Sequence, residues 1–202
     1  MNAADPSADM LAALLPLVEG AGQLSHTGVA QRLAEGVDAA VAVLGVDSIG
    51  LMLLDDRDAL QAVGFSDRPA AQLETAQARA VRGPGVDATR RREVVAVADL
   101  AAAPEYASLW EELGPDGIRA VLAVPLSAGG EVVGNLNAAR RSVHEWTPAE
   151  MAAAEACAKV VGVILELVAR ASASTDALHR LQSPWGTSPE GDHSVAREEG
   201  LG

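Results

Sequence analysis

The sequence predicts an α+β protein, with helices at both ends of the chain and short strands between them. Residues 29–44 carry apolar side chains mostly at every fourth position, which is the spacing of one helical stripe. Short apolar runs bounded by acidic or glycine-containing turns fill the middle of the chain, as is typical of strands. After Trp146, a helix-capping sequence precedes apolar residues at steps of three and four.

Composition favours one soluble globular domain with tails. The chain has 202 residues, 49% of them apolar, which is enough to bury one core. The net charge of −13 would repel phosphate backbones and anionic lipids, so we expect no direct binding to nucleic acid or membrane. The single cysteine, Cys157, excludes a disulfide framework and a multi-cysteine metal site. Since there is no basic leader and no apolar run of membrane-spanning length, we expect a cytoplasmic protein.

The elements follow in order along the chain. Asp9 caps a first helix that carries Leu11 and Leu14, and a second helix over 27–44 stops at Gly45. The runs at 48–56 and 59–65 predict two strands joined by a tight turn. The remaining predictions are a helix over 66–81, a strand at 93–100, a helix at 106–114, and two strands at 118–126 and 131–140 joined by a hairpin loop.

The last helix has the clearest signals. Thr147, Pro148 and Glu150 form a capping box with proline at the first helical position. The apolar seam that follows suits packing against another helix and consists of Met151, Ala154, Ala158, Val161, Leu165 and Val168. We therefore assign 1–8 to an N-terminal tail, 9–170 to the folded domain and 171–202 to a flexible C-terminal tail rich in serine, proline and glycine.

The stretch "GPGVDA" at residues 83–88 matches the glycine pattern of a dinucleotide-binding turn. Such a turn must follow a strand and open a full crossover helix, whereas here a predicted helix precedes Gly83 and a strand begins about eight residues after Gly85. We interpret the glycines as a chain reversal stiffened by Pro84, after which Val86 and Asp87 begin a short helical turn.

This order of elements resembles the GAF domain family over roughly residues 10–170. The stretch "RGPGVDATRRREVVAVADL" is similar to the family's glycine-containing motif, and "IRAVLAVPL" to its valine-proline-leucine strand. The chain is similar to the GAF part of GAF-ANTAR regulators. The resemblance implies a central antiparallel sheet of five or six strands, with helices on one face and a ligand pocket over the other.

Several departures leave the cofactor of this chain unknown. The signature of cyclic-nucleotide-binding members is missing, and Cys157 stands in the last helix and not where bilin-binding members attach their chromophore. The relatives that reduce methionine sulfoxide need several redox cysteines. We find no nucleophile-base set and no metal-ligand spacing, and no histidine lies at an evident haem-ligating place. The chain is therefore predicted to have neither catalytic nor metal-binding residues.

The resemblance implies a pocket bounded by residues of several elements. The candidates are Met52, Val86, Asp87, Val97, Asp99, Tyr106, Trp110 and Val121. Tyr106 and Trp110 share one helical face and would either wall an apolar ligand or pack their helix on the sheet. Asp99 would either meet a polar group of a ligand or cap the following turn.

The terminal helices of GAF proteins commonly form a dimer bundle, so the resemblance implies a homodimer. The candidate contact residues are Leu11, Leu14, Ala154, Ala158, Val161 and Leu165. We expect a non-enzymatic domain that senses an unidentified small molecule and signals through this bundle or through a separate output protein. One alternative is a degenerate domain that serves dimerisation or protein interaction only. The other is a redox enzyme, against which the lone cysteine argues.

Overall fold

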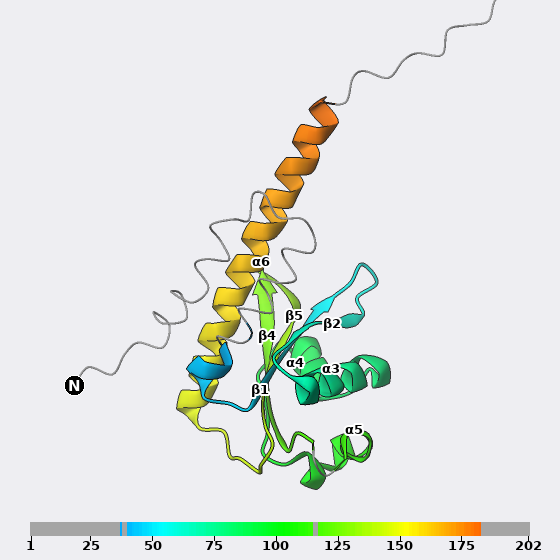
Figure 1. The fold of residues 1–202 in the computed structure, drawn as a ribbon, viewed down its shortest axis with the longest axis vertical. Helices are drawn as coiled ribbons and strands as arrows, with labels where there is room; N and C mark the ends of the chain where they lie inside the picture. Colours follow the sequence, from blue (N-terminus) through cyan, green and yellow to red (C-terminus); the bar gives the residue numbers. More distant parts are fainter. Residues whose placement is uncertain (1–36, 38–39, 115–116, 183–202) are drawn as a thin grey trace, which may run out of the picture.

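The computed structural model describes Val37, residues 40–114 and residues 117–182, with side chains through residue 170. Figure 1 shows a central sheet with one long helix on one side and three short helices on the other. The predicted first helix, with Leu11 and Leu14, lies outside the described residues, as does most of the second. The second ends as predicted, because residues 40–44 are helical and Gly45 follows with a positive φ of 60°.

The sheet has five strands among the described residues, and every neighbouring pair is antiparallel. The strands are β1 (Ser48–Leu54), β2 (Leu60–Phe65), β3 (Val95–Val97), β4 (Ala120–Ala128) and β5 (Glu131–Arg140). Their spatial order is β2-β1-β5-β4-β3, so β1, β5 and β4 form the centre. Four of these strands lie inside runs that the sequence predicted, whereas β4 continues two residues past the predicted end at Leu126, into the expected hairpin loop. The α+β fold with an antiparallel sheet is confirmed.

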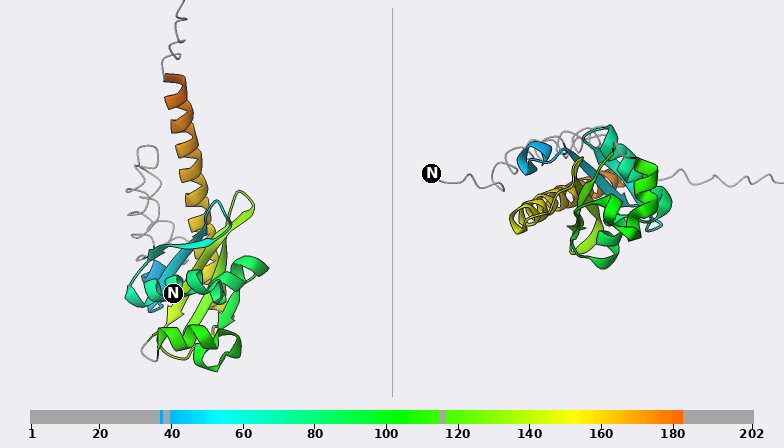
Figure 2. Two further views of the ribbon diagram at one scale, coloured as in Figure 1. Left: turned by 90° about the vertical axis from the view of Figure 1, so that its right-hand side faces the viewer. Right: turned by 90° about the horizontal axis from the view of Figure 1, so that it is seen from below.

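Alternation along the strands sends two different sets of side chains to the two faces. Ile49, Leu51, Leu122 and Leu136 point to the face covered by the long helix α6 (Pro148–Gln182), where they form the larger apolar core. The opposite face carries α3 (Arg68–Ala80), α4 (Pro84–Arg91) and α5 (Ala107–Leu113). The end-on view in Figure 2 shows the same division. The pocket face that we expected is thus itself covered by three short helices.

Helix α4 is longer than the short turn that we expected at "GPGVDA". It runs for eight residues from Pro84, with Gly83 as its N-cap at a φ of 146°, a value that favours glycine. The helix fits before β3 because it lies across the face of the sheet and does not cross over to a parallel strand. The interpretation of Gly83 as a chain reversal is therefore right, and the prediction of only a short helical turn after it is wrong.

Helix α6 begins with the predicted capping box. Thr147 Oγ1 accepts from the Glu150 backbone N–H at 3.2 Å, and Glu150 Oε2 accepts from the Thr147 backbone N–H at 2.9 Å. The helix continues to Gln182, twelve residues into the segment that the sequence assigned to a tail. Figure 1 shows its second half projecting beyond the sheet.

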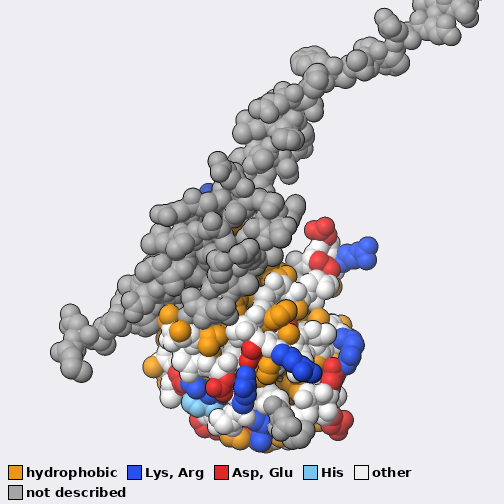
Figure 3. Space-filling view, in the orientation of Figure 1, with side chains coloured by type: hydrophobic (Ala, Val, Ile, Leu, Met, Phe, Trp, Pro, Cys, Tyr) orange, Lys and Arg blue, Asp and Glu red, His pale blue; other side chains and the backbone are white. Residues whose placement is uncertain are grey.

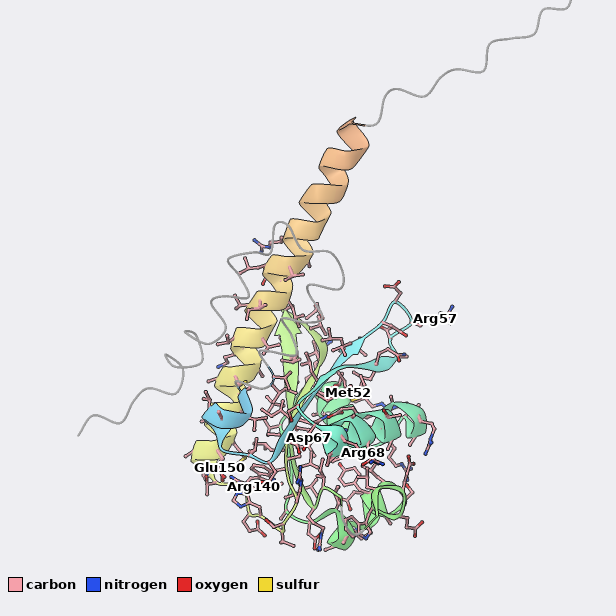
Figure 4. All side chains as sticks on the ribbon, viewed as in Figure 1. Met52, Arg57, Asp67, Arg68, Arg140 and Glu150 are labelled. Carbon is pink, nitrogen blue, oxygen red and sulfur yellow. The ribbon has the colours of Figure 1, made fainter. Side chains whose placement is uncertain are left out.

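A polar junction ties the start of α6 to the end of β5. Arg140 and His144 both contact Glu150 Oε1, at 3.1 and 2.8 Å, and Figure 4 shows Arg140 and Glu150 side by side. Burial raises the pKa of the Glu150 carboxyl, but hydrogen bonds from Thr147, His144 and Arg140 outweigh it and lower the pKa to about 2. Trp146 Nε1 donates to the Val97 carbonyl at 3.2 Å, which links this junction to β3.

Candidate functional site

Two asparagines lie side by side on the face of the sheet beneath α3 and α4. Asn135 and Asn137 alternate with apolar residues of β5 and are 0% exposed. Asn137 pairs with Gly50 and Asn135 with Met52 across the β1–β5 ladder, so all four residues share this face. Figure 4 shows Met52 on the sheet where α3 crosses it. Polar amides at the centre of a sheet are costly unless they are hydrogen-bonded.

Helix α3 supplies the partners of these amides from above. Glu74 and Gln77 stand three residues apart on its buried face and are both 0% exposed. Asn137 Nδ2 donates to the two oxygens of Glu74 at 2.9 and 2.7 Å, and Gln77 Nε2 donates to Glu74 Oε2 at 3.0 Å. The Glu74 carboxyl is therefore held between a strand and a helix by neutral amides alone.

The backbone of Gly85, in the first turn of α4, fixes which way these amides point. Its N–H donates to Gln77 Oε1 at 2.8 Å, which leaves Gln77 Nε2 to face Glu74. Its carbonyl accepts from Asn135 Nδ2 at 3.0 Å, so Asn135 Oδ1 accepts from Asn137 Nδ2 at 2.9 Å. Thr89 Oγ1 also accepts from Asn135 Nδ2, at 2.9 Å. We call Glu74, Gln77, Gly85, Thr89, Asn135 and Asn137 the polar network.

Two glycines are required by the tightness of this network. A Cβ on Gly85 would lie 2.7 Å from Asn135 Oδ1 and 2.8 Å from Asn137 Nδ2, and one on Gly50 would overlap the carboxyl of Glu74. The second glycine of "GPGVDA" therefore permits close approach to buried amides and supplies no unusual backbone conformation, since its φ is not positive. This corrects the sequence interpretation, which gave both glycines the same conformational role.

The network contains a strongly perturbed carboxyl. Burial raises the pKa of Glu74 to about 8, although the hydrogen bonds from Asn137 and Gln77 act to lower it. None of the ion pairs within the described part of the chain involves Glu74. Asn137 Oδ1 is buried and has no hydrogen-bond partner among the residues that the structure describes. Buried groups of this kind concentrate at binding and catalytic sites.

A cavity of about 100 Å³ adjoins the network on one side. Gln77 and Thr89 form part of its wall, together with Val86 of α4 and the tip of the β1–β2 hairpin. The other residues around it are Leu54, Asp58, Ala59, Leu60, Ala78, Val81 and Arg90. A larger groove of about 530 Å³ lies elsewhere, between α6, β4 and the α4–β3 connection, and it includes Ala158 and Lys159 but no member of the polar network.

The pocket candidates from the sequence lie on the face of α3, α4 and α5, but only Val86 reaches the cavity. Met52 and Val121 are 0% exposed, and Val97 is also buried. Val97, Val121 and Tyr106 belong to a second apolar cluster, with Trp110 packed against it. These side chains pack in the apolar core beside the candidate site, and the cavity is lined mainly by other residues.

The polar candidates bind one another. Tyr106 Oη donates to Asp87 Oδ2 at 2.8 Å, and burial and the Asp87 carboxylate raise the pKa of the phenol. Asp99 accepts from Arg119 Nε at 2.8 Å and caps the following turn through the Ala101 N–H at 3.0 Å, the second of the two roles predicted for it. The guanidinium of Arg119 stacks over Trp110 at 5.0 Å and holds the pKa of Asp99 below its usual range.

The described dimer candidates are split between core and surface. Ala154 and Ala158 are 1% and 3% exposed and pack against the sheet of their own domain. Val161 and Leu165 are half-buried, while the neighbouring Val163 is 57% exposed. Val163 and Leu167, the latter 39% exposed, are therefore exposed apolar residues on a surface of α6 that also carries the charged Glu155, Lys159 and Arg170.

Cys157 fits the packing role that we expected of it. It is 0% exposed in the core beneath α6, and burial raises the pKa of its thiol to about 12. Across the residues that the structure describes, no three or more histidine, cysteine, aspartate or glutamate side chains come together as a metal site. Within the same residues no helix has the length and apolar character to cross a bilayer.

Glu74, Gln77, Asn135 and Asn137 were not among the predicted site residues, although the sequence does contain a signal for them. In "VVGNLNAA" two asparagines two positions apart interrupt an apolar strand, which places both on one face. In α3, Glu74 and Gln77 follow the buried Ala70 and Leu73 by four residues each, which places all four on the same face of the helix. The sequence does not indicate that this face of β5 and this face of α3 pack against each other.

The chain belongs to the GAF domain family, whose model matches residues 29–165. This family is one of regulatory and sensory domains. No curated protein matches the chain. The match covers all five strands and the two helices, α3 and α4, that contribute to the polar network, so the site lies inside the family domain.

Solved structures agree with this assignment. A GAF domain of a phosphoenolpyruvate-protein phosphotransferase from Coxiella burnetii has 20% identity and a TM-score of 0.60, covering 85% of this chain and 99% of its own. Free methionine-R-sulfoxide reductase from Neisseria meningitidis, solved with its substrate, has 20% identity and a TM-score of 0.58, covering 87% and 96%. A GAF domain of a Synechocystis protein in its photoproduct state has 19% identity and a TM-score of 0.55, covering 76% and 99%. At these identities the likeness shows the fold alone.

Proposed function

We propose that this chain is a regulatory domain that senses a small molecule at the polar network and passes the signal through α6. The observation that carries the proposal is the network itself. Four fully buried polar side chains meet beneath α3 and α4, beside a cavity, and the burial of a carboxyl among them is costly for folding. A protein that needed only a stable core would do better with apolar residues at these positions.

The route from this site to α6 runs through the sheet. Asn135 and Asn137 belong to β5, and β5 leads directly into the junction where Arg140 and His144 hold Glu150 at the start of α6. A ligand that moves the asparagines would strain this strand and so tilt the helix. Coupling of this kind requires that the ligand prefer one of two arrangements of the network.

We propose further that the output is a homodimer formed along α6. Val163 and Leu167 are 57% and 39% exposed on α6, on the side turned away from Ile164 and Val168, which pack against the core. Exposed apolar residues on a projecting helix favour association with a second copy. Signalling to a separate output protein would use the same face.

Enzymatic turnover has less support. Some similar structures are methionine-R-sulfoxide reductases, but in this chain Cys157 is buried with a raised thiol pKa, on the face of the sheet opposite the polar network. A non-enzymatic role is therefore the proposal that best fits the described residues.

The test of sensing is a thermal-shift screen with nucleotides, haem, flavins, fatty acids and small organic ions. A ligand that binds only the folded state must raise the melting temperature in a concentration-dependent way. A stabilising compound should lose its effect when Asn137 is replaced by leucine and keep it when the exposed Val143 is replaced by threonine. If no compound shifts the midpoint, the chain is a dimerisation module and the sensing proposal fails.

The dimer is tested separately by sedimentation. We expect a dimer at tens of micromolar and a monomer for the double variant Val163→Asp/Leu167→Asp, because two charges would be placed on the apolar face. Val143→Asp places the same charge at an equally exposed valine, 56% exposed and away from α6, and should leave the dimer intact. A monomeric wild-type chain at this concentration would contradict the proposal.

A further inference from the structure

We propose that the molecule sensed at the polar network is a small organic cation, held by the carboxylate of Glu74 and by Asn137 Oδ1. The inference rests on the proposed function, since it names the chemical class of ligand for the same site. The argument depends on which charges and hydrogen-bonding groups the network leaves unmatched, and on the size of the adjoining cavity.

The first unmatched group is the charge of Glu74. The carboxyl is 0% exposed, and within the described residues its hydrogen bonds come from the neutral amides of Asn137 and Gln77. No arginine, lysine or histidine of the described chain forms an ion pair with it. A buried carboxylate without a counter-charge is unfavourable, so the carboxyl of the free protein holds a proton, and a cationic ligand would take the place of that proton as the counter-charge.

The second unmatched group is Asn137 Oδ1, a buried acceptor without a hydrogen-bond partner in the described part of the chain. The orientation of the amide is set by its neighbours, because Gly85 fixes Asn135, and Asn135 Oδ1 in turn accepts from Asn137 Nδ2 at 2.9 Å. Asn137 therefore keeps its oxygen as a free acceptor. Both unmatched groups are acceptors, which favours a ligand rich in N–H donors and disfavours an anion.

The cavity sets the size of the ligand. A volume of about 100 Å³ is roughly three times the share of one water in the liquid, enough for a guanidinium or methylammonium group. Gln77 lines the cavity and also donates to Glu74 at 3.0 Å, so it separates the two. Rotation of the Gln77 side chain would let a ligand N–H take over its bond to Glu74. The exposed rim of the cavity carries Asp58 and Arg90, which have opposite charges. The rim therefore favours neither cations nor anions, and Glu74 determines which charge of ligand binds.

The experiment is isothermal titration calorimetry of the full chain at pH 7 with methylguanidinium chloride. Methylurea, a neutral molecule of nearly the same shape, is the matched ligand control, with sodium chloride added to equal ionic strength. We expect saturable binding of methylguanidinium and at least tenfold weaker binding of methylurea. A carboxyl with a pKa of about 8 is about nine-tenths protonated at pH 7, so cation binding should release about 0.9 proton. Titrations in phosphate and in MOPS, two buffers with different enthalpies of ionisation and no net positive charge, measure this release.

Glu74→Gln should abolish both the binding and the proton release, whereas Glu131→Gln, which removes an exposed carboxylate, should change neither. Equal binding of methylurea, retained binding in Glu74→Gln, or no proton release from the wild-type chain would overturn the inference. If Glu74→Gln does not fold, the wild-type proton release and the methylurea comparison decide alone. A nucleotide or flavin that stabilises the chain while methylguanidinium does not would refute the cation and leave sensing intact. If nothing binds, sensing fails as well.

Discussion

The buried carboxyl of Glu74 should make the stability of the domain depend on pH in a way that can be calculated. Its pKa is raised from the ordinary value of 4.5 to about 8 in the folded chain. A raised pKa means that the folded state holds a proton that the unfolded state has lost. The stabilisation is therefore complete below pH 4.5 and is lost as the pH rises to 8. Between pH 5.5 and 7.5 the folded state holds about one extra proton, so the free energy of unfolding falls by about 3 kcal/mol.

Urea unfolding followed by tryptophan fluorescence measures this change at pH 5.5, 6.5 and 7.5. Other carboxyls also titrate, so the informative quantity is the difference between the wild-type chain and Glu74→Gln at each pH. That difference should change by about 3 kcal/mol across the range, whatever its value at one pH. Glu131→Gln, at an exposed position, should track the wild-type chain. A difference between wild type and Glu74→Gln that stays constant within about 0.5 kcal/mol would refute the reasoning.

Three further substitutions test the contacts around the site, all by urea unfolding. Tyr106→Phe removes a 2.8 Å hydrogen bond to Asp87 and should lower the free energy of unfolding by about 1 to 2 kcal/mol; no change would mean that water replaces the bond. Gly85→Ala should lower the free energy of unfolding by about 2 kcal/mol or more, because its Cβ would lie 2.7 Å from a buried amide oxygen. Gly64→Ala is the control: its Cβ would meet only an ordinary 3.5 Å contact, so the free energy of unfolding should change by under about 1 kcal/mol. Thr147→Ala should cost about 1 kcal/mol and Thr147→Ser almost nothing, since serine keeps the capping hydroxyl; equal losses would contradict the capping role.

The sequence predicted the fold well because the signals for it are local. The capping box at Thr147 and the tight turn after β1 depend on residues close in the chain, and both are found in the structure. Each described strand lies within a short apolar run that could be read without knowledge of its neighbours, except that β4 extends two residues into the predicted hairpin loop. The length of α4 was underestimated because about eight residues before the next strand are too few for a helix that connects two parallel strands. Helix α4 makes no such connection, so it fits in this short segment.

The site was predicted less well because it depends on contacts between residues far apart in the sequence. Asn137 and Glu74 are 63 positions apart, and Asn135 bonds Gly85 across 50. The periodicity of each element indicates which face is buried, but it does not indicate which polar residues meet there. The resemblance to GAF domains placed the candidates on the same face of the sheet as the polar network, yet it selected Tyr106 and Trp110, which pack in the neighbouring apolar cluster.

The length of α6 turns it into a mechanical lever. The last of its described residues that packs against the core is Val168, and the helix continues to Gln182. Fourteen further residues at a rise of about 1.5 Å each make an arm of about 21 Å. A tilt of about 5° at Val168 would therefore move the far end of the helix by about 2 Å. A displacement too small to change the core could in this way become large enough for a partner to distinguish.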